Sequence, residues 1–547
     1  MSRRRTAFAR AVDALFTRRR KLTPATTDYS VERGMLVPMR DGAELVADLY
    51  TPVGASRGLI LVRTAYGRGF PISTEFVRPY AERGFTVLIQ STRGTHGSGG
   101  TKVPFHNEIE DGADTVEWMR HQPWFPGRFA FHGLSYLGYN GWAIMMDPPP
   151  ELATAVISSA PHHFGRMATG PGAAAPEMFL GFSDGYGHQE TDSIPRVLWR
   201  SSTMKKRHAP VLNALPLAGA EVELLEGRAP WYREWLAHPD PNDDYWADGN
   251  FDEALQRVSV PLLIQGGWQD LFLEEAVQEY EALHSRGIPV ALTLGPWTHP
   301  DAGGIASSRL GNEALAWLAE VLAEEPTADS RLVNPVRIQV GGVDEWRALE
   351  SWPPPAEDRI LLLGAGGALG ESPSVASTAF TYDPADPTPN VGGATQMQNP
   401  GSKEQGELEA RSDVLTFTTG PLAADLEVIG TPRLRLFHDT DNPYADLMVR
   451  VCDVHPDGRS FNLAERYVRL DPAAASGELE LSLRPMAHRF LAGHRVRVQV
   501  SGGAFPRYLR NLGTDAAPGV GVELVPSNRT VWHDVSRPSS ISLPITK

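Results

Sequence analysis

Short apolar runs alternate with longer mixed stretches between about residues 35 and 330. Six of these runs have the composition of buried strands: GLILVRT (58–64), TVLIQ (86–90), RFAFHG (128–133), ATAVISS (153–159), PLLIQGG (261–267) and VALTLG (290–295). Near-continuous apolar runs are typical of strands in a sheet that is covered on both faces. The pattern therefore predicts an α/β domain built on a mainly parallel sheet.

The stretch from 161 to 255 interrupts this alternation. It is rich in Trp, Tyr, His, Pro and Gly, and it lies between two of the predicted strands. We interpret it as an inserted, mainly helical cap. The α/β domain is then discontinuous and consists of residues 31–160 and 256–330.

From about residue 331 the apolar runs become shorter and often alternate with polar positions. PVRIQV, LRLFHD, LMVRVCDV, ELELSL and RVRVQVSG are examples, and Gly, Pro, Asn and Asp separate them. Regularly spaced strands of this kind predict an antiparallel β-sandwich over 331–547. The segment from about 366 to 412 has few apolar residues, so we expect a long surface loop there.

Composition narrows the function classes. The 547-residue chain has a net charge of −15, which argues against nucleic acid as a partner. Its single cysteine, Cys452, excludes an intrachain disulfide and a cysteine-based metal cluster. Residues 1–30 are basic, and Arg10 and Asp13 break their apolar run, so we expect an amphipathic helix or a disordered arm rather than a secretory signal. No apolar run could span a membrane, and a cytoplasmic location is the default expectation.

Ser135 stands at an abrupt corner between a predicted strand and an apolar, small-residue stretch, in FHGLSYLGYNGWAIMM (131–146). A serine there can be a helix cap. It can also be a nucleophile, which needs a base, a group that orients the base, and donors for an oxyanion. On an α/β sheet these partners follow in the order Ser, Asp, His.

Two residues downstream satisfy that order. Asp270 follows the predicted strand 261–267, and His299 follows the strand 290–295. With Ser135, both lie at carboxyl ends of predicted strands, where open α/β sheets carry their sites. An aspartate after a strand is also a common turn former, and most histidines in turns are structural, so spacing alone leaves the triad a hypothesis.

At these residues the chain resembles the cocaine esterase and X-prolyl dipeptidyl-peptidase group of serine hydrolases, which includes cephalosporin acylases and α-amino-acid ester hydrolases. The family's motif around the nucleophilic serine, G-x-S-Y-x-G, matches GLSYLG (133–138). GGWQDLF and LGPWTHP hold Asp270 and His299 where the family keeps its triad residues. TGPLAADLEVIGTPRLRLF, DVHPDGRSFNLAERYVRL and FPRYLRNLGT are similar to its non-catalytic domain. The resemblance implies an α/β-hydrolase domain with an inserted helical cap and a C-terminal β jelly-roll domain.

The resemblance also implies an oxyanion hole and shows one departure. The backbone N–H after the nucleophile is that of Tyr136, and the family's tyrosine hydroxyl after the first core strand falls at Tyr66. The family motif D-x-R-G-x-x-x-S-x-G appears as STRGTHGSGG (91–100), with Ser91 in place of the aspartate. We expect this change to affect local hydrogen bonding and not the triad.

The resemblance implies acyl transfer on a small-molecule ester or amide, without a metal or organic cofactor. A carboxylesterase is the first expectation. The alternative within the same chemistry is an X-prolyl dipeptidyl-peptidase or an acylase for β-lactams or amino-acid esters. An alternative of another class is a non-catalytic binding protein that retains the fold. Trp268, Phe272 and Trp297 are candidate substrate-binding aromatics. The acidic candidates for a substrate ammonium are Glu274, Glu275 and Asp184, although a solvated surface charge is the commoner role. Whether the chain forms a homo-oligomer stays open.

Overall fold

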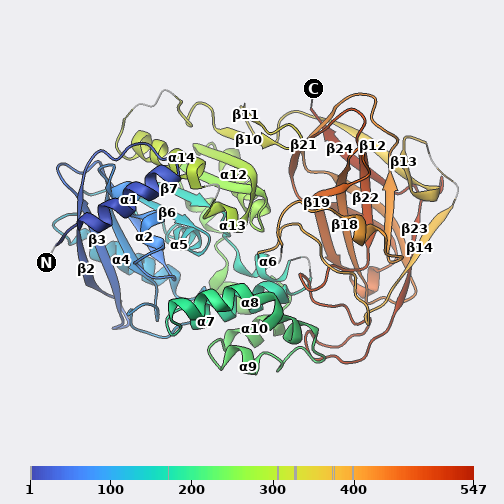
Figure 1. The fold of residues 1–547 in the computed structure, drawn as a ribbon, viewed down its shortest axis with the longest axis horizontal. Helices are drawn as coiled ribbons and strands as arrows, with labels where there is room; N and C mark the ends of the chain where they lie inside the picture. Colours follow the sequence, from blue (N-terminus) through green and yellow to red (C-terminus); the bar gives the residue numbers. More distant parts are fainter. Residues whose placement is uncertain are drawn as a thin grey trace.

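The computed structural model describes residues 3–170, 172–304, 307–325, 329–372, 374, 376–396 and 399–546. Figure 1 shows two β-rich halves side by side, with the chain running from the blue N-terminal half to the red C-terminal half. No helix in these described residues is long and apolar enough to cross a membrane.

The first half is built on one sheet whose seven central strands are parallel. Its strands lie in the order β1 (Arg3–Arg4), β2 (Tyr29–Pro38), β3 (Glu44–Pro52), β5 (Thr86–Ser91), β4 (Leu59–Thr64), β6 (Phe129–Leu134), β7 (Leu152–Ser158), β8 (Leu262–Gln269), β9 (Val290–Thr298), β10 (Val336–Val340) and β11 (Glu345–Leu349). The strands from β5 to β10 in this order are parallel to one another. The six strands predicted from the apolar runs agree with β4 to β9 within a few residues.

Helices cover both faces of this sheet. Helices α4 (Glu108–Arg120), α5 (Tyr136–Ile144) and α12 (Leu273–Ser285) share one core with Leu59 and Leu61, while α2 (Ile72–Phe76), α3 (Arg78–Ala81) and α14 (Ser307–Val321) share the other with Ile60 and Val62. Alternate residues of each strand thus enter opposite cores, which explains why the strand sequences are apolar at nearly every position.

The segment between β7 and β8 is mainly helical, as the sequence predicted. It contains α6 (Phe164–Thr169), α7 (Pro176–His188), α8 (Ile194–Asn213), α9 (Val222–Leu225), α10 (Trp231–Ala237) and α11 (Ala254–Arg257). Figure 1 shows α7 to α10 together at the lower centre of the view. This helical layer covers the carboxyl ends of the central strands.

The second half is a C-terminal jelly roll with its own apolar core. Its strands are β12 (Glu357–Gly364), β13 (Ala368–Gly370), β14 (Ser377–Tyr382), β15 (Val414–Thr418), β16 (Leu426–Gly430), β17 (Arg433–Thr440), β18 (Asp446–Val454), β19 (Ser460–Arg469), β20 (Gly477–Ser482), β21 (Met486–Phe490), β22 (Arg495–Ser501), β23 (Ser527–Trp532) and β24 (Ser540–Ile545). All pairs but β13 with β15 are antiparallel.

Three sequence expectations need correction or completion. PVRIQV, assigned to the sandwich, forms β10 in the first sheet, because Val336, Ile338 and Val340 enter the first core. The expected surface loop at 366–412 contains β13, β14 and the short helix α15 (Gly406–Glu409), and part of it is buried. The N-terminal arm forms the helix α1 (Ala7–Arg19).

Helix α1 is held to the first half by a polar contact and not by an apolar stripe. Asp13, which breaks the apolar run, is buried there. It accepts hydrogen bonds from the Tyr29 hydroxyl at 2.8 Å and from Arg5 and Arg78 at 2.9 and 3.1 Å.

Candidate active site

Four of the predicted site residues lie at the same edge of the first sheet. Tyr66 follows β4, Ser135 follows β6, Asp270 follows β8 and His299 follows β9. Because these strands are parallel members of one sheet, their carboxyl ends lie at the same edge. The sheet topology therefore brings together residues that are up to 233 positions apart in sequence (66 to 299).

The turn at Ser135 is conformationally unusual. Its φ of 57° and ψ of −126° place a non-glycine residue in the left-handed half of backbone space, and its side chain makes no cap hydrogen bond. A Cβ on Gly133 would lie 2.3 Å from the Leu137 carbonyl, and a Cβ on Gly138 would lie 2.5 Å from the Ala160 Cβ. Glycine is thus required two residues before and three residues after the serine, which accounts for both glycines of the G-x-S-Y-x-G motif.

His299 lies between Ser135 and Asp270. Its Nε2 is 3.0 Å from the Ser135 Oγ, and its Nδ1 is 3.1 Å from Asp270 Oδ2. Asp270 is fully buried and also accepts a 2.8 Å hydrogen bond from the Phe272 backbone N–H. Burial alone would raise the pKa of the Asp270 carboxyl, but His299 and these hydrogen bonds hold it below its usual value. Asp270 is therefore an anion at neutral pH.

Both tyrosines expected at the oxyanion hole line the same small cavity as Ser135. The Tyr66 hydroxyl has no hydrogen-bond partner among the described residues, and burial raises its pKa, so it remains a neutral donor. Tyr136 begins α5, where the first backbone N–H groups have no partner inside the helix. Its hydroxyl accepts from the Phe105 N–H at 2.7 Å and donates to Glu108 at 3.0 Å, which fixes this corner.

The cavity beside Ser135 is uncharged. Its volume is about 30 Å³, and it is lined by Tyr66, Phe105, Ser135, Tyr136, Pro161, Phe164, Met178, Phe182, Trp235, Leu271, Phe272 and Gln396. Aromatic rings dominate its wall: Phe105 stacks on Phe164 at 3.7 Å between ring centroids and lies 5.5 Å from Phe182. Such a wall favours an apolar or aromatic group over a charged one.

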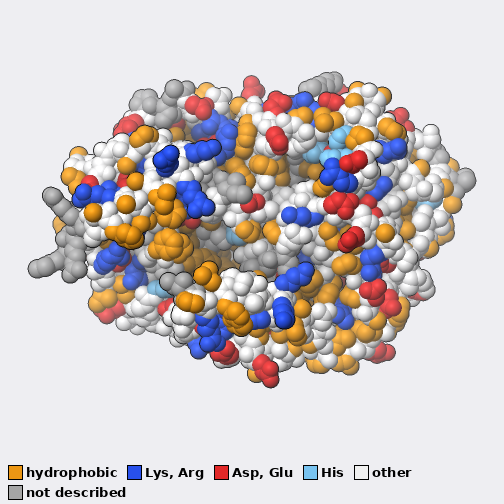
Figure 2. Space-filling view, viewed as in Figure 1, with side chains coloured by type: hydrophobic (Ala, Val, Ile, Leu, Met, Phe, Trp, Pro, Cys, Tyr) orange, Lys and Arg blue, Asp and Glu red, His pale blue; other side chains and the backbone are white. Residues whose placement is uncertain are grey.

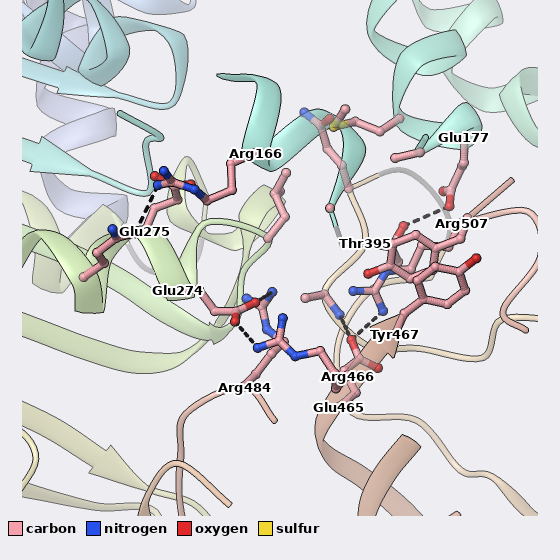
Figure 3. Close-up of a pocket in the computed structure, with 18 residues that line it drawn as sticks. Arg166, Glu177, Glu274, Glu275, Thr395, Glu465, Arg466, Tyr467, Arg484 and Arg507 are labelled. Atoms are coloured by element: carbon pink, nitrogen blue, oxygen red, sulfur yellow. Dashed lines mark hydrogen bonds and ion pairs between the residues drawn. The ribbon is translucent and has the colours of Figure 1, made fainter. Parts of the chain in front are cut away.

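A larger, charged cleft adjoins this cavity and shares Met178, Leu271 and Gln396 with it. Its volume is about 340 Å³, and Figure 3 shows that the cap, the first sheet's helices and the jelly roll all contribute to its wall. Figure 2 shows a hollow near the centre of the face in view. The charged cleft and the small cavity at Ser135 therefore meet at these three shared residues.

Carboxylates in the cleft are engaged by cations from the jelly roll. Glu274 pairs with Arg484 at 3.3 Å and also with Arg466, and Glu465 pairs with Arg450 at 3.2 Å and also with Arg507. Figure 3 shows Glu274 between Arg466 and Arg484. The positive and negative side chains of the cleft thus compensate one another.

Arg484 also reaches the triad. Its guanidinium donates a hydrogen bond to the backbone carbonyl of Asp270, and its side chain is nine-tenths buried. Gln269, the neighbour of Asp270, donates to the Leu463 carbonyl of β19 at 2.7 Å. The jelly roll therefore holds the loop that carries Asp270.

Two of the three aromatic substrate candidates do not lie at the site. Trp268 donates to the Gln339 carbonyl at 2.7 Å and packs on Trp352, and Trp297 packs on Trp346. Both are core residues, because their side chains point from strand ends into the interior rather than into either cavity. Phe272 does line the cavity, with its ring 5.0 Å from that of His299.

The acidic candidates all have partners within the protein, and Glu275 and Asp184 are also buried. Glu275 lies 2.7 Å from the Nδ1 of His162, and Asp184 pairs with Arg200 at 2.8 Å and with His208 at 3.1 Å. Glu274 has the two arginine partners described above. None is an unpaired carboxylate beside Ser135.

Ser91, which replaces the family aspartate, accepts a hydrogen bond from Arg68. Arg68 also contacts Asp48 at 3.4 Å, and the Ser91 carbonyl accepts from Ser98 at 2.9 Å. The Ser91 side chain is therefore held by an arginine that it shares with Asp48 and that lies outside the cavity at Ser135.

Several residues of the site carry no sequence signal of their own. Phe105 and Trp235 lie in loop and cap segments, and Gln396 lies in the segment that was expected to be a surface loop. Arg484 belongs to the other half of the molecule. Only the tertiary fold brings these four to Ser135 and Asp270.

Comparisons with known proteins agree with this architecture. Residues 41–301 match the model of the X-Pro dipeptidyl-peptidase (S15 family), and residues 332–542 match the X-Pro dipeptidyl-peptidase C-terminal non-catalytic domain. The chain is 32% identical to a cocaine esterase from Rhodococcus sp. (strain MB1 Bresler), over 95% of this chain and 99% of that protein.

Two solved structures share the fold over nearly the whole chain. An aminopeptidase from a marine sediment Thaumarchaeota archaeon has a TM-score of 0.80 and 25% identity, covering 96% of this chain and 98% of the other. An α-amino acid ester hydrolase has a TM-score of 0.79 and 22% identity with the same coverage. The chain therefore belongs to the cocaine esterase and X-Pro dipeptidyl-peptidase family and is a serine hydrolase.

Proposed function

We propose that the protein is a carboxylesterase that works through an acyl-enzyme on Ser135. His299, oriented by Asp270, takes the proton of the Ser135 hydroxyl as the oxygen attacks the ester carbonyl. The histidine then returns this proton to the leaving alcohol, and water hydrolyses the acyl-enzyme by the same steps. The contacts of 3.0 and 3.1 Å from the two His299 nitrogens support these roles.

The oxyanion would be bound by two donors of different kinds. The Tyr136 backbone N–H lies at the start of α5, and the Tyr66 hydroxyl lines the cavity that contains Ser135. Because both are neutral, they favour the transition state without attracting an anionic ground state. These steps use no metal or organic cofactor.

The uncharged cavity at Ser135 is the observation that favours an ester over a peptide as the substrate. An apolar acyl group gains by transfer into its aromatic wall, whereas a free ammonium or carboxylate would lose its hydration there. A dipeptidyl-peptidase must bind the ammonium of its substrate. The acidic side chains that line the adjoining cleft already have partners: Glu274 and Glu465 pair with arginines, Glu275 pairs with His162, and Glu177 accepts a hydrogen bond from Thr395 at 2.9 Å. An ester of an uncharged acid is therefore favoured over a peptide.

A substrate panel tests this proposal. We expect p-nitrophenyl esters of short aliphatic acids and of benzoic acid to have kcat/KM values well above those of Ala-Pro-p-nitroanilide and amino-acid amides. Ser135→Ala serves as the control for uncatalysed hydrolysis. Preferred cleavage of Ala-Pro-p-nitroanilide would identify a dipeptidyl-peptidase instead. Preferred cleavage of amino-acid esters or amides would identify an acylase.

A further inference from the structure

Three histidines surround one aspartate on the jelly roll, outside both cavities. Asp453 lies near the end of β18, and His455 follows that strand directly. His488 lies in β21, and His494 immediately precedes β22. Figure 2 shows histidine side chains gathered over this part of the jelly roll, open to solvent.

The nitrogen atoms face the carboxylate. His494 Nδ1 lies 2.8 Å from Asp453 Oδ1, and His455 Nε2 lies 3.8 Å from Asp453 Oδ2. One ligand atom from each of these three residues lies within 4.8 Å of the other two. His488 Nε2 lies 3.0 Å from Asp453 Oδ2. Asp453 is buried, and His455 and His494 have side chains that are 34% and 12% exposed.

We propose that Asp453, His455 and His494 bind a divalent transition-metal ion of the zinc class, and that His488 orients the Asp453 carboxylate. Two imidazoles and a carboxylate are donors that suit zinc and its neighbours, and they are a poor set for calcium or magnesium, which prefer oxygen ligands. Water would complete the coordination from the exposed side.

The distances need only a small adjustment. Ligand atoms of a tetrahedral zinc ion are about 3.3 Å apart, since each lies about 2.0–2.2 Å from the metal. The 2.8 Å separation involves Asp453 Oδ1 and the 3.8 Å separation involves Oδ2, so a shared ion requires the carboxylate to turn one oxygen toward both imidazoles. The partly exposed His455 ring packs against His494 at 4.6 Å between ring centroids, which keeps the two imidazoles side by side. A neutral imidazole that binds a metal through Nδ1 carries its proton on Nε2, so binding shifts His494 from the tautomer that donates to Asp453.

A second cluster, made of one histidine and two glutamates, differs from this one in burial and in the partners of its histidine. His162, Glu275 and Glu279 also lie within ligand distance of one another, but all three are buried. There Asp252 contacts His162 Nε2 at 3.2 Å while both glutamates contact Nδ1. Burial opposes the charge, yet these carboxylates raise the pKa of His162 well above its usual value. Both ring nitrogens of His162 are therefore already engaged by carboxylates inside the protein, and none of the three residues faces solvent.

The proposed ion would join two segments that are separate in sequence. His455 begins the turn between β18 and β19, while His494 ends the connection between β21 and β22. Gly493 already approaches Pro456 across this gap. Because none of these residues lines the cavities at Ser135, we expect the ion to stabilise the jelly roll and to leave the ester chemistry unchanged.

Zinc titration of the full chain tests the site. The protein is treated with EDTA, exchanged into metal-free buffer and titrated with ZnCl₂ by calorimetry; Co²⁺ binding is followed by its visible absorption. We expect one equivalent of Zn²⁺ at micromolar concentration, a Co²⁺ spectrum showing nitrogen ligands, and a higher melting temperature with zinc. Hydrolysis of the preferred p-nitrophenyl ester should not change.

Three variants locate the ion. His455→Ala removes a ligand whose ring makes no hydrogen bond to a described residue, so folding should be unaffected. It should weaken zinc binding by about 100-fold, and so should His494→Ala. His121→Ala, at the exposed histidine that caps the C-terminus of α4, is the matched control and should bind as the wild type does. No stoichiometric binding by the wild type, or equal binding by wild type and His455→Ala, would refute the site.

Discussion

Deletion of the Tyr66 hydroxyl separates an oxyanion donor from an ordinary buried tyrosine. Tyr66→Phe removes one oxygen and keeps the ring, which contacts Tyr136 and Tyr186 edge to face at 6.2 and 6.5 Å between centroids. Because the hydroxyl has no hydrogen-bond partner among the described residues, its loss leaves no described buried group unpaired. The free energy of unfolding should therefore change by less than about 1 kcal/mol.

The effect on catalysis should be far larger. Loss of one oxyanion donor typically lowers kcat by about 10²–10³-fold, or about 2.7–4 kcal/mol of transition-state stabilisation. KM should change little, because the hydrogen bond strengthens only as charge develops on the carbonyl oxygen. Tyr66→Phe should thus lower kcat strongly while the free energy of unfolding changes little.

Tyr186→Phe supplies the matched control. It deletes the same oxygen from a neighbouring buried ring that does not line the cavity at Ser135. Steady-state kinetics on a p-nitrophenyl ester and thermal melting are measured for both variants. If Tyr66→Phe retained kcat within a few-fold of the wild type, or if Tyr186→Phe lost as much, Tyr66 would not be the donor.

Three further substitutions test other parts of the account. Asp270→Asn should lower kcat by about 10⁴-fold because the amide no longer stabilises the charged histidine in its working tautomer, and a loss below tenfold would exclude Asp270 from the triad. Arg484→Met removes the donor to the Asp270 carbonyl and should lower kcat by about 10–100-fold with little change in KM. Arg484→Lys supplies a donor again and should restore part of kcat. Unchanged kinetics in Arg484→Met would show that this contact does not position the triad. The pKa of His162 is raised in the folded protein, so protonated His162 stabilises the fold. This stabilisation is fully present below the pKa of about 6.5 that a histidine has in the unfolded chain, and it is lost as pH rises through the folded pKa. Urea unfolding should therefore show His162→Gln to be more destabilising at pH of about 6 than at about 9, and a difference independent of pH would contradict the assignment.

The parts that the sequence predicts well are those fixed by local periodicity. Strands β4 to β9 were recognisable because both of their faces are buried, so their apolar runs are nearly continuous. Ser135, Asp270 and His299 could be grouped because parallel strands end at one edge. The helical cap was visible as an interruption between two such strands.

The rest depends on contacts across the chain. The alternation in PVRIQV predicts a strand but does not say which sheet it joins, and β10 pairs with β9 in the first. The segment that contains Ala394 was expected on the surface, but the Ala394 N–H donates to the buried Glu465 at 2.9 Å. Arg484 meets Asp270 across 214 positions of sequence. No local pattern encodes such contacts.

Identification of the residue acylated by a serine-directed reagent tests the central claim most directly. A fluorophosphonate probe is incubated with the full chain, and the modified peptide is identified by mass spectrometry. We expect one adduct, on Ser135, with labelling and ester hydrolysis lost together in Ser135→Ala while the melting temperature is retained. An adduct on another serine, or near-normal ester turnover by Ser135→Ala, would contradict the account.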